Sequence, residues 1–115
     1  MYIFPVRHKG ANELKYIFPS KQRAVQKAIE LAESDSRINK IIIFGSAVTR
    51  QCGIFSDVDI ALITDKLDDD EFDAVAGPFF KEVPSELDIV DYNNISSKLL
   101  KKEIDENGVC VYVRQ

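Results

Sequence analysis

The sequence predicts a small α/β (α+β) fold, in which a mixed β-sheet is covered by helices. Short runs rich in isoleucine and valine alternate along the chain with longer segments whose apolar residues recur at intervals of three and four. Gly, Pro, Asn and Asp stand between these segments, where turns are expected. The resulting order is helix, strand, short helix, strand, helix, strand, helix, strand.

Length and composition are typical of one globular domain. A chain of 115 residues can bury a core without disulfides. A zinc site is disfavoured, because the two cysteines, Cys52 and Cys110, lie far apart in the sequence and there is one histidine. A net charge of −4 without a long basic tract disfavours extended nucleic-acid binding. No stretch approaches the roughly 18 apolar residues of a membrane span, and we find no signal peptide. We therefore expect a cytoplasmic protein that does not enter a membrane.

Residues 1–19 form an N-terminal extension in this interpretation, and residues 20–115 form the single domain. The extension contains Tyr2-Ile3-Phe4-Pro5 and then the same four residue types at 16–19, each arm ending in a proline. His8 lies among basic residues and is interpreted as a surface residue. The aromatic residues of the extension suit a core, a partner contact or a homo-oligomer, and the sequence leaves these alternatives open.

A first helix is expected from Ser20 to about Ser34. Its apolar residues recur at three and four, and Ser20 is a suitable N-cap. Lys21 is assigned with the other charged residues to the solvent-exposed face. Residues 35–40 then form the turn into the first strand.

Two buried strands, Ile41–Phe44 and Val58–Ile63, frame the most informative stretch of the chain. Side chains alternate between the faces of a strand, so Asp57 and Asp59 point to the same face. Two carboxylates placed so close together repel each other, and folding alone gives little reason for the pair. A divalent cation removes the objection, because Mg²⁺ takes oxygen ligands, including carboxylates and substrate phosphates. The pair therefore predicts part of a metal site.

The connection between these strands opens with Gly45-Ser46. Glycine at a strand end lets the backbone approach a ligand closely, and a following serine can cap a short helix whose N–H groups face a phosphate. Arg50 could add a cation near a polyphosphate. This stretch therefore predicts a nucleotide-binding turn, with Gly45, Ser46 and Arg50 as its residues.

The next helix begins at the acidic run 65–71. Acidic residues are favourable in the first turn of a helix, so we interpret the run as a helix start rather than a metal cluster. Gly77-Pro78 is expected to end or distort this helix.

The third strand is expected over Pro84–Tyr92. Asp88 and Asp91 are three residues apart and face opposite ways, so only one can join Asp57 and Asp59, and we choose Asp88. A last helix over Ile95–Glu106, capped by Asn93 or Asn94, and a strand over Val109–Tyr112 complete the chain.

These motifs together resemble the minimal nucleotidyltransferases of the DNA polymerase β-like superfamily. The resemblance rests on Gly45-Ser46, ten intervening residues, then Asp57-x-Asp59 and a later strand that carries Asp88, and it covers about residues 20–112. It implies a polymerase β-like nucleotidyltransferase fold. Many relatives have Gly-Ser-x-Ala-Arg-Gly, whereas Arg50 is displaced by one position here.

The resemblance also implies a mechanism. Asp57, Asp59 and Asp88 would be both the catalytic residues and the ligands of two Mg²⁺ ions, while Gly45-Ser46 positions the triphosphate of ATP. The ions would clamp the attacking and leaving oxygens at the α-phosphorus, and Asp88 is also a candidate general base. A nucleoside monophosphate would pass to an acceptor hydroxyl, with pyrophosphate as the second product.

The acceptor and partner follow from the same resemblance. Minimal nucleotidyltransferases occur as antitoxins beside HEPN-type ribonuclease toxins, which implies transfer of AMP from ATP to a hydroxyl of a protein partner. Two alternatives remain open at this stage. The chain could be a catalytically idle binding module that neutralises a partner by contact, or a transferase that acts on a small molecule or RNA end with a second subunit.

Overall fold

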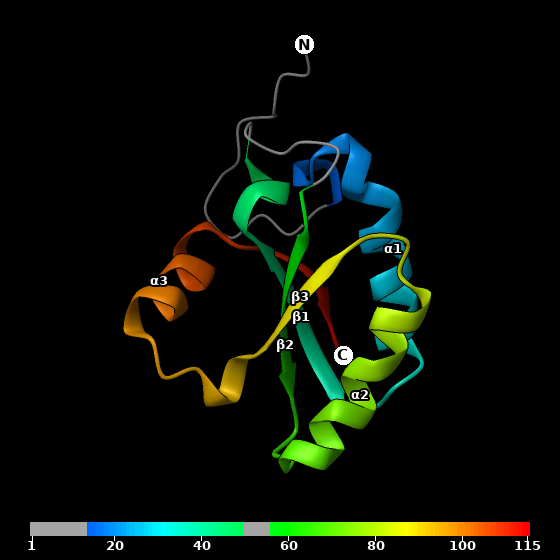
Figure 1. The fold of residues 1–115 in the computed structure, drawn as a ribbon, viewed down its shortest axis with the longest axis vertical. Coiled ribbons are helices and arrows are strands. Elements are labelled where there is room, and N and C mark those ends of the chain that lie inside the picture. Colours follow the sequence, from blue (N-terminus) through cyan, green and yellow to red (C-terminus); the bar gives the residue numbers. More distant parts are fainter. Residues whose placement is uncertain (1–13, 50–55) are drawn as a thin grey trace.

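A computed structural model describes residues 14–49 and 56–115 and confirms the predicted fold class. Figure 1 shows the arrangement of its helices and strands. The helices are α1 (Pro19–Glu33), α2 (Asp69–Glu82) and α3 (Lys98–Asn107), with short 3-10 helices η1 (Leu14–Tyr16), η2 (Gly45–Val48) and η3 (Tyr92–Asn94). The strands are β1 (Ile38–Phe44), β2 (Val58–Thr64), β3 (Leu87–Asp91) and β4 (Val109–Val113).

The sheet is mixed, with the strand order β3-β2-β1-β4. β1 lies antiparallel to both β2 and β4, whereas β2 and β3 are parallel. A parallel pair needs a crossover connection, and α2 provides it by packing on the sheet between β2 and β3. The starts of β2 and β3 therefore lie side by side at one edge of the molecule.

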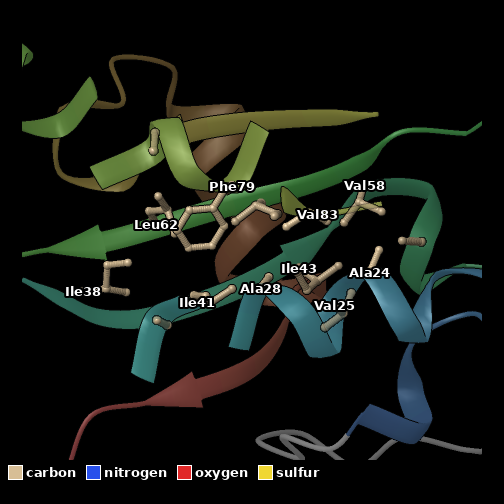
Figure 2. Packing of buried hydrophobic residues seen from close by; sticks show 14 of the residues in the cluster. Ala24, Val25, Ala28, Ile38, Ile41, Ile43, Val58, Leu62, Phe79 and Val83 are labelled. Atoms are coloured by element: carbon tan, nitrogen blue, oxygen red, sulfur yellow. The ribbon is translucent and has the colours of Figure 1, made fainter. Parts of the chain in front are cut away.

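The larger core lies between the sheet and the pair α1 and α2, which occupy one side of the strands in Figure 1. Figure 2 shows Ile41 and Ile43 of β1 and Leu62 of β2 facing Ala28 and Phe79 of the two helices. These five side chains are at most 1% exposed. Alternate residues of each strand enter this core, as expected for a sheet covered on both faces.

The smaller core lies on the opposite face, beneath α3. Ile42 and Phe44 of β1 and Ala61 of β2 pack there against Ile104 of α3 and Cys110 of β4. Burial raises the pKa of the Cys110 thiol, which lies within this core. α3 covers this face of the sheet, whereas α1 and α2 cover the other (Figure 1). Among the helices in the described ranges, none combines the length and apolar character needed to span a membrane.

Helix α1 corrects two predictions. It begins at Pro19 rather than behind a Ser20 cap, and Phe18 is the N-cap residue, without a side-chain cap hydrogen bond. Proline suits the first helical position because its fixed φ is helical and no N–H is needed there. Lys21, assigned to the solvent-exposed face, is only 6% exposed. Tyr16, just before the helix, is buried in the larger core.

Helix α2 begins as predicted but does not end at Gly77-Pro78. The Asp68 carboxylate accepts a hydrogen bond from Glu71 N–H, and the Glu71 carboxylate accepts one from Asp68 N–H, which completes a capping box. The helix continues through Pro78 to Glu82. Gly77 and Pro78 lie on its exposed face, where water can bond the carbonyl that proline leaves free, while buried Phe79 anchors the last turn in the core.

Other boundaries also differ from the prediction, and β2 and β4 each end one residue later than expected, at Thr64 and Val113. β1 begins at Ile38, because the fully buried Ile38 side chain belongs to the sheet rather than to the preceding turn. β3 is limited to Leu87–Asp91. α3 begins at Lys98, with Ser97 as its N-cap, while Tyr92–Asn94 form η3 instead of a cap.

Candidate active site

Gly45 places the end of β1 directly against the acidic end of β2. In the antiparallel register, Phe44 is opposite Asp59, so Gly45 is next to Asp59 at the rim of the sheet. Gly45 has φ of +73°, and a Cβ built on it would collide with Asp59 Oδ2. Only glycine combines this backbone conformation with this close approach. The Gly45 backbone and the Asp59 carboxylate therefore form one wall of the candidate site.

Ser46 lies inside η2 instead of capping it, which corrects the predicted cap. Phe44 is the N-cap residue and makes no side-chain cap hydrogen bond. The Ser46 carbonyl accepts hydrogen bonds from Thr49 N–H and Thr49 Oγ1–H, both at 3.0 Å, so the turn is closed by its own residues. This leaves the Ser46 hydroxyl without a partner in the described part of the chain.

A contact that the sequence did not reveal holds the turn in place. Phe18 N–H donates a hydrogen bond of 2.8 Å to the Ala47 carbonyl, which ties η2 to the residue before α1. Ala47 is fully buried beneath it. No local motif signals this contact, because the two residues belong to segments far apart in the sequence.

Asp88 lies beside Asp59. β2 and β3 are parallel, with Asp59 opposite Asp88 and Val58 opposite Leu87. Val58 and Leu87 pack into the larger core, so Asp59 and Asp88 extend from the other face of the sheet. Opposed side chains on one face of paired strands lie within interaction distance of each other. The parallel register is therefore the feature that brings the two carboxylates together.

The charge of the third carboxylate, Asp57, also affects Asp59. The pKa of Asp59 is raised to about 6, first by burial and then by the negative charges of Asp88 and Asp57. Asp57 and Asp88 themselves are exposed. No described cation forms an ion pair with any of these carboxylates. The site is thus a concentration of negative charge that its own described surroundings do not neutralise.

The three carboxylates suit Mg²⁺ in chemistry, since oxygen donors of this charge are its preferred ligands. As the side chains are placed, residues 14–49 and 56–115 contain no group of three or more His, Cys, Asp or Glu side chains that could hold a metal ion. Asp57 and Asp88 are exposed, so their side chains have room to change rotamer.

Other candidate residues lie elsewhere or outside the described residues. Asp91 is opposite Leu62, at the far end of β3, and its Oδ2 accepts a hydrogen bond from Asn94. Near the site, the carbonyl of Glu86, the residue before β3, accepts a hydrogen bond of 2.9 Å from Val58 N–H and so joins the starts of β2 and β3. Arg50 falls in residues 50–55, outside the described chain, so its contact with phosphate stays a prediction.

Several solved structures similar to this chain are toxin–antitoxin structures. A structure described as a toxin–antitoxin with AMP-PNP matches with a TM-score of 0.64 and 26% identity, over 78% of this chain and 73% of that one. The structure of a tri-AMPylated HEPN toxin from Shewanella oneidensis in complex with MNT antitoxin matches with a TM-score of 0.60 and 26% identity, over 83% and 74% of the two chains.

A third structure, of the toxin–antitoxin MntA-HepT, has a TM-score of 0.60 and 25% identity, over 82% of this chain and 74% of that one. No curated protein matches the chain. The profile of the family described as Polymerase beta, Nucleotidyltransferase matches residues 26–115, a range that contains η2, β2 and β3. The chain therefore belongs to the polymerase β nucleotidyltransferase family.

Proposed function

We propose that this nucleotidyltransferase transfers AMP from ATP to a hydroxyl of a HEPN-type toxin and so acts as its antitoxin in the cytoplasm. The observation that carries the proposal is the register that sets Asp59 beside Asp88, with the Gly45 backbone against Asp59. Family membership supports the reaction class. The AMP-PNP complex and the tri-AMPylated HEPN toxin among the similar structures support the nucleotide and the acceptor.

The proposed roles follow the geometry of the rim. Asp57, Asp59 and Asp88 would hold Mg²⁺, with two ions expected for this class of reaction. The Gly45 backbone and the unengaged Ser46 hydroxyl would orient the triphosphate. Bound Mg²⁺ would offset the charge of the carboxylates and the triphosphate and lower the pKa of the acceptor hydroxyl.

The transfer itself is an in-line displacement. A bond forms between the acceptor oxygen and the α-phosphorus, the bond from the α-phosphorus to the β-phosphate oxygen breaks, and pyrophosphate leaves. The acceptor proton needs a base, and Asp88 is the candidate because it is exposed at the open side of the site. Asp59 is packed against Gly45, so it is better placed to hold a metal ion than to take up the proton.

The test is an adenylylation assay. The purified chain is incubated with Mg²⁺, ATP and the HEPN-type protein encoded by the neighbouring gene, and both proteins are weighed intact by mass spectrometry. We expect one or more AMP units on the HEPN-type protein. Asp57→Asn and Asp59→Asn should each reduce transfer by at least about a hundredfold, because the site loses a carboxylate that would hold Mg²⁺.

Asp65→Asn is the matched control, since Asp65 follows the opposite end of β2 and accepts a hydrogen bond from Asn39. It should leave the transfer rate unchanged. Neutralisation of the toxin that persists in both site variants would contradict a catalytic antitoxin and favour a binding module. AMP transfer to an RNA end or a small molecule, with none to the protein, would contradict the proposed acceptor.

A further inference from the structure

The charges of α3 run against the dipole of the helix. Its first turns carry Lys98, Lys101 and Lys102, and its second half carries Glu103, Asp105 and Glu106. A helix is stabilised by acidic residues at its N-terminus and basic residues at its C-terminus, so both halves have the unfavourable sign. α2 of the same chain has the favourable pattern, with three acidic residues in its first turn and Lys81 in its last. The lysines of α3 are therefore not explained by helix stability.

The same end of α3 exposes a large apolar side chain. Leu99 is 82% exposed, the highest value among the large apolar side chains of the described chain. Lys98 precedes it and Lys102 follows one turn later, both exposed and without an ion pair among the described residues. Lys101 differs, because its Nζ lies 5.0 Å from the centre of the Tyr92 ring. Lys98, Leu99 and Lys102 form what we call the α3 patch.

A cavity of about 300 Å³ lies next to the α3 patch. Val90, Ile95 and Leu100 provide its apolar lining, together with Asp91. The Oδ1 atom of Asp91 is buried and has no hydrogen-bond partner in the described chain, whereas its Oδ2 accepts from Asn94. Because Oδ1 is enclosed, an outside donor does not reach it, and the apolar side chains are what the cavity offers to a partner.

We propose that the α3 patch and this cavity form the docking surface for the partner protein, which rests on the proposed function. The chemistry of the surface specifies its occupant. Lys98 and Lys102 fit acidic side chains, Leu99 fits an apolar depression, and the cavity lined by Val90, Ile95 and Leu100 fits an apolar side chain. Charge complementarity of this kind speeds association and selects the partner.

A protein fits this surface better than a nucleic acid. Lysines alone would suit phosphates, but an 82% exposed leucine between them and an apolar cavity beside them would not. The acceptor of the proposed reaction must also be held while the Asp59 end of the sheet acts on it. Docking on α3, which covers the face from which Asp59 and Asp88 extend, would anchor a protein on that same side.

The test reverses the two charges with Lys98→Glu/Lys102→Glu. Isothermal titration calorimetry with the HEPN-type protein of the neighbouring gene should show binding at least about tenfold weaker than for the unaltered chain, and the unaltered chain should bind more weakly as salt is raised. Arg23→Glu/Lys81→Glu, on α1 and α2, changes the net charge equally and should bind normally. AMP-PNP binding should be the same in all three proteins.

A second readout guards against simple loss of structure. Far-UV circular dichroism and urea denaturation should show that the free Lys98→Glu/Lys102→Glu chain is folded, because both side chains are exposed and glutamate is favourable at residue 98 in the first turn of α3. Equal partner binding by this variant and the unaltered chain would overturn the docking surface while leaving the transferase intact. Loss of binding to an RNA oligonucleotide, with partner binding kept, would overturn the protein docking surface as well. Absence of any complex with the unaltered chain would overturn the proposed partner and the docking surface together.

Discussion

At the scale of single residues, the site shows how function opposes stability. Asp59 is held between the Gly45 backbone and two further carboxylates, and no described cation offsets its charge. Ionised Asp59 therefore lowers the stability of the folded chain, because its charge is partly buried and is repelled by the other carboxylates. We interpret the cost as the consequence of a site shaped for a cationic ligand.

The cost has a defined pH dependence. The pKa of Asp59 is raised from 3.8 to about 6, so the folded state binds its proton more tightly than the unfolded state. This contribution to stability is fully present below about pH 4 and is lost as the pH rises through about 6. Asp59→Asn should therefore match the original chain at pH 4 and be more stable at pH 7, by roughly 1–2 kcal/mol after allowance for solvent screening.

Urea denaturation between pH 4 and pH 7, without metal, measures this difference. Asp88→Asn provides the internal check, because the charge of Asp88 is the second cause of the raised pKa of Asp59. That variant should show a shallower loss of stability with pH than the original chain. A difference between Asp59→Asn and the original chain that stays constant over the whole range would contradict the assignment.

At the scale of elements, local sequence decides where α2 begins and tertiary packing decides where it ends. The Asp68–Glu71 capping box is complete within four residues of sequence, with hydrogen bonds of 2.8 and 3.0 Å. The end is set by Phe79, whose burial in the core keeps the helix going past Pro78.

Asp68→Ala should lower the free energy of unfolding by about 1 kcal/mol, because Glu71 N–H loses the carboxylate that accepts its hydrogen bond. Asp70→Ala, in the same turn and without a capping bond, should cost only a few tenths of a kcal/mol. Urea denaturation of both variants gives the comparison. Equal effects would show that charge, not capping, stabilises this helix start.

At the scale of the whole molecule, Arg114 connects the residues after β4 to the end of α1 and the start of β1. The Arg114 guanidinium donates hydrogen bonds to the carbonyls of Ile38 (2.9 Å), Ala32 (3.2 Å) and Asp35 (2.5 Å). Arg114 N–H donates to the Asn39 carbonyl at 2.8 Å. The end of β4 thus supplies partners for carbonyls at the end of α1 and the start of β1.

Arg114→Ala should lower the free energy of unfolding by about 2 kcal/mol, since carbonyls that accept from a charged donor lose it. Gln115→Ala, the exposed neighbour, should have almost no effect. Thermal unfolding of the two variants distinguishes them, and hydrogen exchange should show faster opening at the end of α1 in Arg114→Ala alone. Similar stability of the two variants would argue against the role of Arg114.

The sequence by itself determined the order of the elements, the fold class and the choice of Asp57, Asp59 and Asp88 as candidate site residues. Periodicity, turn residues and strand alternation are local properties, and these predictions depend on them, while the choice of Asp88 over Asp91 also used the resemblance to the family motif. The structure places Asp59 and Asp88 side by side and leaves Asp91 at the far end of β3. The catalytic role of the three carboxylates and the phosphate contact of Arg50 stay predictions.

Only the tertiary structure decided the strand order β3-β2-β1-β4, the parallel pairing of β2 with β3 and the contact of Phe18 with Ala47. The burial of Lys21 and the continuation of α2 past Pro78 are likewise results of tertiary packing. These outcomes depend on which segments meet in space, and local patterns do not encode such contacts. The same reason explains why the α3 patch became visible only in the fold, since exposure of Leu99 depends on what the rest of the chain leaves uncovered.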